Sequence, residues 1–240
     1  MSVWRQRWLD RFYDRSKGFV DGTAEFHALV HHAIPPGGRI LEIGAGLTNE
    51  TSIFLASRGE VWGLDPDPDV MTNTALARAF VLEGREFPLE DASFDAAVSN
   101  YVVEHVDDPE MHFREVRRVL RPGGAYVFRA PNRWHYVAII SSMTPHAVHK
   151  LVANRARALG PDAHDPYPTH YRLNTRGRVR RFAEKAGLHL EELRMIEKEP
   201  MYGLMARPLF LAFMAYERVV NSSPAFEGLR ANLLVVLRRD

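Results

Sequence analysis

One carboxylate and two glycines lie close together in the stretch RILEIGAGLTNE, which spans residues 39–50. An apolar run containing Glu42 is followed directly by Gly44-Ala45-Gly46. The run predicts a short buried strand, and the glycines predict a tight turn into a helix that Thr48 or Asn49 could cap. Glycines at such a turn let backbone N–H groups approach a ligand that a Cβ atom would exclude. The stretch therefore predicts a ligand site made of backbone N–H groups and one acidic side chain.

Other polar residues follow the ends of further apolar runs. Asp65 ends EVWGLD and is followed by Pro66, and Glu83 ends AFVLE. Asn100 ends FDAAVSN and is followed by Tyr101. Parallel sheets bind ligands beyond the carboxyl ends of their strands, so these residues are candidates for the same site.

Three histidines are candidate general bases: His105 in VVEHV, His135 in PNRWHY and His170 in YPTHYR. An imidazole titrates near neutral pH and could take a proton from a substrate hydroxyl. Three others, at positions 27, 31 and 32, are expected on the solvated side of a helix. Glu104 and His105 are too few ligands for a metal ion, so no metal site is predicted.

Strand and helix patterns alternate along most of the chain. Helical spacing covers residues 3–32, and IPPGG (34–38) breaks the chain before the first strand. Strands are expected at 39–43, 60–65, 79–83, 94–100, 125–130, 188–197 and 231–239. Helices are expected at 48–58, about 68–78, 109–120 and 175–187. This alternation predicts an α/β fold with a mostly parallel sheet covered on both faces.

Two segments interrupt the alternation and are interpreted as insertions. Residues 132–170 are rich in histidine, proline and aromatic residues and are expected to form a cap, with helical pieces such as VAIISSM and AVHKLVANRARAL. A second helical insertion is expected at about 203–220. We therefore expect a single domain over residues 1–240: an N-terminal helical segment (1–34), a core (39–131), the cap, and the rest of the core (171–240).

Composition restricts the class of protein. The 240 residues have a formal net charge of +1 and include no cysteine. This charge gives no general electrostatic reason to bind nucleic acid, and the lack of cysteine excludes disulfides and thiolate metal sites. The charged N-terminal stretch does not look like a signal peptide, and no apolar run is long enough to cross a membrane. We expect a cytoplasmic protein.

Two nucleotide-binding motifs compete for the glycine turn. A nicotinamide fingerprint needs a third glycine where Asn49 stands. The two-glycine turn preceded by Glu42 instead resembles motif I of class I S-adenosylmethionine-dependent methyltransferases. The stretches VWGLDPD, FVLEG, EFPLEDASFDAAVSN, NYVVEHVDDPEMHFREVRRVLRPGG and YVFRAPN follow in that family's order.

The resemblance implies a Rossmann-like three-layer sandwich with a seven-stranded sheet whose last strand is antiparallel, plus helical cap insertions. It implies S-adenosyl-L-methionine as cofactor and favours a lid over the cofactor for the N-terminal helical segment (1–34), with ordinary helix packing as the alternative. Glu42 would lie near the cofactor's positive end, and Gly44, Ala45 and Gly46 would approach it with their backbone. Asp65, with Pro66 beside it, would bind the ribose, and Glu83 would lie near adenine. Asn100 and Tyr101 would line the methyl-transfer site. Gly84-Arg85 stands where an aspartate is commoner, which weakens the adenine assignment.

The acceptor is expected to be a small molecule, with O-methylation preferred and carbon or nitrogen acceptors left open. No Asn/Asp-Pro-Pro-Tyr/Phe motif follows the fourth strand, which speaks against amino methylation of DNA or glutamine. The alternatives are a tRNA-modifying methyltransferase, favoured by the run RGRVRR (176–181), and a non-catalytic partner subunit of the same fold. The apolar stretch near 203–220 could be a packed helix, a wall for a lipophilic acceptor or a dimer face. A monomer and a homodimer therefore both remain open.

Overall fold

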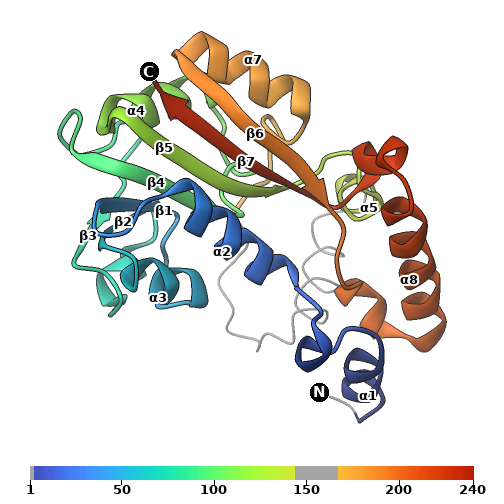
Figure 1. The fold of residues 1–240 in the computed structure, drawn as a ribbon. Helices are drawn as coiled ribbons and strands as arrows, with labels where there is room; N and C mark the ends of the chain where they lie inside the picture. Colours follow the sequence, from blue (N-terminus) through green and yellow to red (C-terminus); the bar gives the residue numbers. More distant parts are fainter. Residues whose placement is uncertain (1–2, 144–166) are drawn as a thin grey trace. The chain divides into compact units, whose positions relative to one another are not determined.

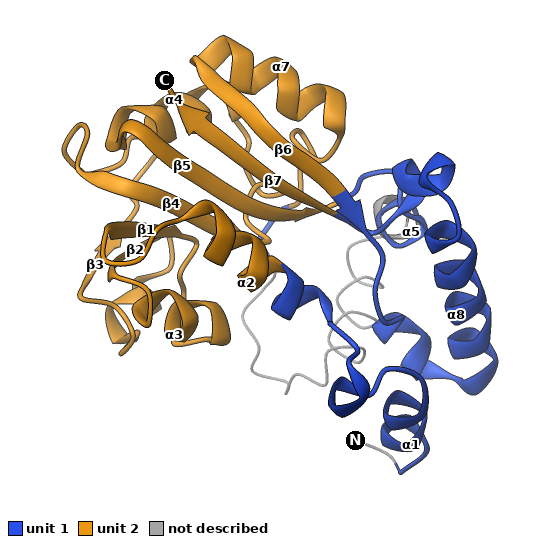
Figure 2. Ribbon diagram, viewed as in Figure 1, with its two compact units in different colours: residues 1–25, 132–168, 195–232 blue, residues 26–131, 169–194, 233–240 orange. Residues whose placement is uncertain are grey.

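The structure, a computed structural model, describes residues 3–143 and 167–240. These residues form two compact units (Figure 2). Unit 1 comprises residues 1–25, 132–168 and 195–232, and unit 2 comprises residues 26–131, 169–194 and 233–240. The central part of the predicted cap, including AVHKLVANRARAL, lies outside the described residues.

A seven-stranded sheet organises unit 2 (Figure 1). Its strand order is β3-β2-β1-β4-β5-β7-β6. The pairs β1–β2, β1–β4, β2–β3 and β4–β5 are parallel, as the sequence pattern predicts, and β7 is antiparallel, as the family resemblance implies. The strands are β1 (Arg39–Ile43), β2 (Glu60–Asp65), β3 (Arg78–Val81), β4 (Phe94–Asn100), β5 (Leu120–Pro131), β6 (Leu188–Ile196) and β7 (Asn232–Arg239).

The central strands are apolar almost throughout because the sheet is covered by helices. Ile40, Leu41, Ala96 and Val98 are completely buried. Such uninterrupted apolar runs are typical of parallel strands that are buried on both faces. The one carboxylate within β1, Glu42, is also buried, which makes it exceptional among these residues.

The helices of unit 2 begin at side-chain caps. The Asn49 side chain accepts hydrogen bonds from the N–H groups of Thr51 and Ser52 at the start of α3 (Glu50–Ala56). Asp108 and Thr175 cap α4 (Pro109–Val119) and α7 (Arg176–Ala186) in the same way. Each cap satisfies backbone donors that the first helical turn leaves unpaired. The cap on α3 fixes the helix that directly follows the glycine turn.

Unit 1 is held together by aromatic packing between segments far apart in sequence. It contains α1 (Val3–Phe12), η1 (Arg15–Lys17), α5 (Tyr136–Met143), η3 (Met201–Met205), α8 (Arg207–Asn221) and η4 (Pro224–Leu229), and α2 (Gly22–Ala33) begins in it. Phe210 of α8 is fully buried, and its ring contacts Trp8, Phe12 and Tyr13. The second insertion is thus a helix whose inner face packs against the N-terminal segment.

Two predicted helices differ in the structure. The helix expected over 3–32 is divided into α1, η1 and α2, because Gly18 adopts a left-handed φ of 91° and Asp21 accepts the N–H groups of Thr23 and Ala24 to start a new helix. The helix expected at 68–78 is only the short η2 (Pro68–Thr72). There Asn73 turns the chain, because its side chain donates to Gly46 O (3.1 Å) and Ser52 Oγ (3.2 Å).

No helix among the described residues is long and apolar enough to cross a membrane.

Candidate functional site

The glycine turn after β1 has the backbone conformation that the sequence predicts. Gly44 and Gly46 have φ values of 73° and 49°, in the left-handed region that favours glycine. The Gly44 N–H donates to Leu64 O at 2.7 Å, and a Cβ on Gly44 would lie 2.2 Å from Val102 Cγ2. A Cβ on Gly46 would meet nothing closer than Asp65 Oδ2 at 3.9 Å. Gly44 is therefore required by packing, whereas Gly46 leaves room beside the turn.

Glu42 is an ionisable group in an apolar environment. Its residue is only 3% exposed, and Oε2 has no hydrogen-bond partner among the described residues. Burial is the main cause that raises the pKa of Glu42 to about 7; a hydrogen bond with Ser52 lowers this pKa, and the negative charge of the nearby Asp65 raises it, and both effects are included in that value. A buried carboxylate with an unpartnered oxygen is costly unless a cation or donor completes it.

Asp65, at the end of β2, is tied to the glycine turn. Its Oδ2 accepts the Gly46 N–H at 2.9 Å, and its Oδ1 accepts the Asp67 N–H at 2.8 Å. Burial raises its pKa, and these two hydrogen bonds oppose the shift. The structure thus brings Glu42, Gly46 and Asp65 together at the carboxyl edge of neighbouring strands.

Two asparagine side chains stabilise the glycine turn by hydrogen bonds to its backbone carbonyls. Besides its bonds to Gly46 and Ser52, Asn73 Nδ2 lies 3.4 Å from Ala45 O. Asn49 Nδ2 donates to the same Ala45 O at 2.9 Å while its oxygen caps α3. The cap at Asn49 follows from its place after the glycines. The role of Asn73 has no local sequence signal, because it depends on contacts with residues more than twenty positions away.

Asn100 and Tyr101 lie where β4 ends. Asn100 Nδ2 donates to Thr51 Oγ1 at 3.1 Å, so it reaches the first turn of α3. Tyr101 is 41% exposed and has a left-handed φ of 59°. That conformation is uncommon for a bulky residue and persists only where surrounding contacts enforce it.

Pro66 and Glu83 are exposed, in contrast to Glu42 and Asp65. Glu83 follows β3, and the preceding Leu82 N–H donates to Asp65 O at 2.8 Å. Glu83 therefore lies beside the edge that carries Asp65. Its position is compatible with the predicted adenine contact but does not test it.

The three candidate bases are divided between the two units. His105 is part of the turn after β4, where its N–H donates to Val102 O at 2.9 Å. The backbone carbonyl of its neighbour Glu104 accepts the N–H of His170 at 2.7 Å, so His105 and His170 belong to joined segments of unit 2. His135 belongs to unit 1, where its buried Nε2 is 3.3 Å from Glu197 Oε2.

Two residues of this edge have no clear signal in the sequence. His27, expected to be solvated, stacks on Phe54 with ring centroids 4.2 Å apart, and its Nε2 lies 3.4 Å from Thr51 Oγ1. Arg129 is only 4% exposed, and its Nε donates to Asn100 Oδ1 at 2.8 Å. Neither a histidine on a helix nor an arginine in a strand predicts such contacts from local pattern alone.

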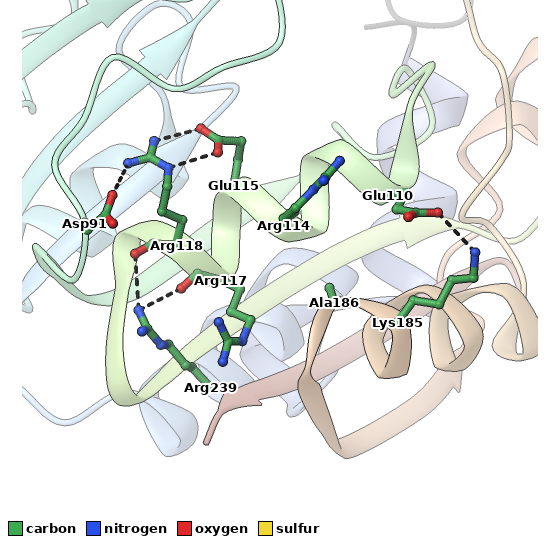
Figure 3. Close-up of a pocket in the computed structure, with 9 residues that line it drawn as sticks. All are labelled: Asp91, Glu110, Arg114, Glu115, Arg117, Arg118, Lys185, Ala186 and Arg239. Atoms are coloured by element: carbon green, nitrogen blue, oxygen red, sulfur yellow. Dashed lines mark hydrogen bonds and ion pairs between the residues drawn. The ribbon is translucent and has the colours of Figure 1, made fainter.

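A pocket of about 520 Å³ lies between α4, α7 and the end of β7 (Figure 3). Five of its lining residues are basic, but most of them already have partners within the fold. Arg118 is 2.7 Å from carboxylate oxygens of Asp91 and Glu115, Lys185 is 3.1 Å from Glu110, and Arg239 donates to backbone carbonyls at the end of α4. None of the predicted cofactor residues lines this pocket, so it is separate from the site at the carboxyl edge.

Among the described residues, no group of three or more acidic or histidine side chains could hold a metal ion.

Comparison with known proteins identifies the type of domain. Residues 41–128 match the family model of a methyltransferase domain, which includes the glycine turn, Asp65 and β4. An uncharacterized methyltransferase of Mycobacterium sp. (strain JLS) is 38% identical over 125 residues, which are 49% of this chain and 48% of that protein. The chain thus spans about half the length of this curated relative.

Solved structures show the same fold at low sequence identity. An S-adenosylmethionine-dependent methyltransferase from Mesorhizobium loti gives a TM-score of 0.56 at 19% identity, covering 90% of this chain and 96% of that one. The geranyl diphosphate C-methyltransferase of Streptomyces coelicolor A3(2), solved with Mg²⁺, geranyl diphosphate and S-adenosyl-L-homocysteine, gives 0.55 at 17% identity. That alignment covers 91% of this chain and 80% of that one.

Proposed function

We propose that this chain, whose residues 41–128 match a methyltransferase domain, is a class I S-adenosylmethionine-dependent methyltransferase that transfers a methyl group from this cofactor to a small-molecule acceptor. We propose O-methylation first, with carbon and nitrogen acceptors as the next choices. S-adenosylmethionine is the cofactor of this family.

The observation that carries the proposal is the buried carboxylate of Glu42 beside the glycine turn. Its Oε2 has no hydrogen-bond partner among the described residues, and burial disfavours its charge. The cofactor carries an ammonium and a sulfonium, and a cation at this place would satisfy the carboxylate. NAD carries a pyrophosphate instead, and its negative charge would oppose that of Glu42.

The other predicted cofactor residues supply complementary contacts. Each carboxylate oxygen of Asp65 accepts one backbone N–H, from Gly46 or Asp67, and keeps a further lone pair. Asp65 can therefore also accept hydrogen bonds from the ribose hydroxyls. The absence of a Cβ on Gly46 leaves space for a close backbone approach. Ala45, Pro66 and Glu83 are proposed to border the adenosine, and Asn100 and Tyr101 the methyl group.

The bound cofactor supplies an activated methyl group, and the protein must hold the acceptor in line with it and exclude water. A base is needed only if the acceptor must lose a proton. We propose His105 for this role because it follows β4, with His170 as the alternative from the segment hydrogen-bonded to Glu104. His135, the third candidate base, lies in unit 1, where its Nε2 is 3.3 Å from Glu197 Oε2.

Two alternatives need a direct test. A tRNA-modifying enzyme would use basic residues of α7, of which Arg176, Arg178, Arg180 and Arg181 are exposed. Arg178 also donates to the backbone carbonyls of Tyr171 and Arg172, which favours a structural role for it. A non-catalytic partner subunit is disfavoured by the presence of Glu42, both glycines and Asp65.

Calorimetry with S-adenosylmethionine, S-adenosylhomocysteine and NAD tests the proposal. We expect micromolar binding of the first two, roughly −7 to −8 kcal/mol, and no competition by NAD. Binding of NAD without any response to the methionine derivatives would overturn it. A salt-dependent shift of tRNA would favour the RNA alternative, and a panel of hydroxylated small molecules tested for methyl uptake would address the acceptor.

A further inference from the structure

Arg129 is a buried cation at the edge of the sheet where the cofactor residues gather. It lies on β5 directly opposite Asn100 of β4 in the parallel register, and it is only 4% exposed. Its Nε donates to Asn100 Oδ1 at 2.8 Å. Burying a guanidinium is expensive, so a residue retained there needs compensating contacts.

Aromatic rings supply part of this compensation. The guanidinium carbon lies 4.5 Å from the centre of the Tyr101 ring and 5.3 Å from that of Phe26. The Tyr101 N–H also donates to Arg129 O at 2.9 Å. Arg129 thus contacts Tyr101 through both backbone and side chain, at the residue whose left-handed φ needs external support.

The contacts continue from Arg129 to the cofactor-binding turn. Asn100 accepts from Arg129 and donates to Thr51 Oγ1, and Thr51 also lies within 3.4 Å of His27 Nε2. Thr51 belongs to the first turn of α3, whose cap, Asn49, bonds to Ala45 O. The Thr51 N–H donates to Asn49 Oδ1 at 2.9 Å, so a continuous path of side-chain and backbone hydrogen bonds joins the turn after β4 to the glycine turn after β1.

We propose that Arg129 is a positioning residue, which fixes Asn100 and Tyr101 against the first turn of α3 and so shapes the methyl-transfer side of the cofactor site. The inference rests on the proposed function, because it assigns Arg129 to that site. It requires the planar guanidinium and not only its charge. Lysine cannot reproduce the Nε hydrogen bond together with the stacking on two rings.

The test measures S-adenosylhomocysteine affinity in Arg129→Met and Arg129→Lys, at a temperature where thermal scans show each variant folded. We expect both variants to bind at least about tenfold more weakly than wild type, the change that follows from losing a charge-assisted hydrogen bond. Arg121→Met is the matched control. Arg121 also lies on β5 and pairs with a β4 side chain, Asp95, at 2.5 Å, but at the start of these strands and with its side chain 45% exposed. We expect its affinity to stay within twofold of wild type.

The outcomes separate the inference from the proposed function. If wild type does not bind the ligand, the proposed function fails. If wild type binds and both Arg129 variants bind equally well, the positioning role is wrong. Retained affinity in Arg129→Lys alone would show that charge suffices, which also overturns the proposal. If neither Arg129 variant folds, Thr51→Val decides: it removes the hydroxyl that receives Asn100 Nδ2, and an unchanged affinity would contradict the path of contacts.

Discussion

Burial gives Glu42 a different response to pH from that of an exposed glutamate. Its pKa in the folded protein is raised to about 7, from the value of 4.5 that is usual for a glutamate exposed to water. The folded state therefore binds more protons than the unfolded state between these two values. In that interval, the free energy of unfolding of the ligand-free protein falls as pH rises. In Glu42→Gln this contribution is absent, so chemical denaturation at pH 5 and pH 7 should show a smaller decrease than in wild type.

The same group should make cofactor binding depend on pH. A cationic ligand favours the ionised carboxylate, so binding below pH 7 must first remove a proton from Glu42. With a pKa of about 7 we expect S-adenosylmethionine to bind roughly tenfold more tightly at pH 8 than at pH 6. Calorimetry in buffers of different ionisation enthalpy would detect the released proton. A pH-independent affinity in wild type would contradict a role for Glu42, and Glu42→Gln should bind weakly at both pH values.

Asp65 should matter for both the turn and the ligand. Asp65→Ala removes the acceptors of the Gly46 and Asp67 N–H groups together with the proposed ribose contacts. We expect S-adenosylhomocysteine affinity to fall by about 2 kcal/mol, roughly thirtyfold. Asp67→Ala is a nearby control, since Asp67 caps η2 and should alter affinity less than threefold. Equal losses in the two variants would indicate a general disturbance of the loop.

Residues at strand ends could be predicted because their position follows from the strand pattern. The sequence places Glu42, Gly46 and Asp65 at one sheet edge, and the structure brings them together. Asn73 and Arg129 could not be predicted in this way. The hydrogen bonds from Asn73 to Ser52 and from Arg129 to Asn100 span 21 and 29 positions of the chain, and nothing in the local pattern of either residue indicates them.

At the level of elements, we expect substitutions of the two glycines in the turn between β1 and α3 to have different effects on stability and on cofactor affinity. Gly44→Ala places a Cβ 2.2 Å from Val102 Cγ2 in a left-handed conformation, so we expect a loss of stability of about 2 kcal/mol or more. Gly46→Ala has space and should cost about 1 kcal/mol of backbone strain, yet its methyl group would enter the proposed cofactor space. Denaturation and calorimetry on both variants check this. Unchanged cofactor affinity in Gly46→Ala would show that this glycine only forms the turn.

Strands were predicted more accurately than helices. The strands at 39–43, 60–65 and 94–100 have the predicted bounds, because an apolar run between turn residues defines both ends. The prediction of a helix at 68–78 was wrong because the Asn73 side chain donates a hydrogen bond to Gly46 O, which turns the chain toward the glycine turn. The prediction of one long N-terminal helix was wrong because Gly18 ends η1 and Asp21 caps the start of α2. The helical spacing of the apolar residues continues across both positions, so it did not indicate this break.

At the level of the whole molecule, three elements contain the boundaries between the compact units. The boundaries after residues 25, 194 and 232 fall inside α2, β6 and β7. A helix or strand that continues from one unit into the other cannot easily melt in one unit alone. We therefore propose that residues 1–240 act as a single domain that unfolds cooperatively.

Hydrogen exchange with and without S-adenosylhomocysteine tests this cooperativity. The predicted cofactor residues all lie in unit 2, so ligand contacts alone would protect amides of that unit. If the chain unfolds as one, the slowest amides of α8 in unit 1 should gain the same protection as those of β1 and β4. Ligand at about one hundred times its dissociation constant should add roughly 2.7 kcal/mol to both sets. Protection confined to β1 and β4 would show that unit 1 opens independently. The aromatic packing around Phe210 would then stabilise a separate folding unit, and the single-domain proposal would be wrong.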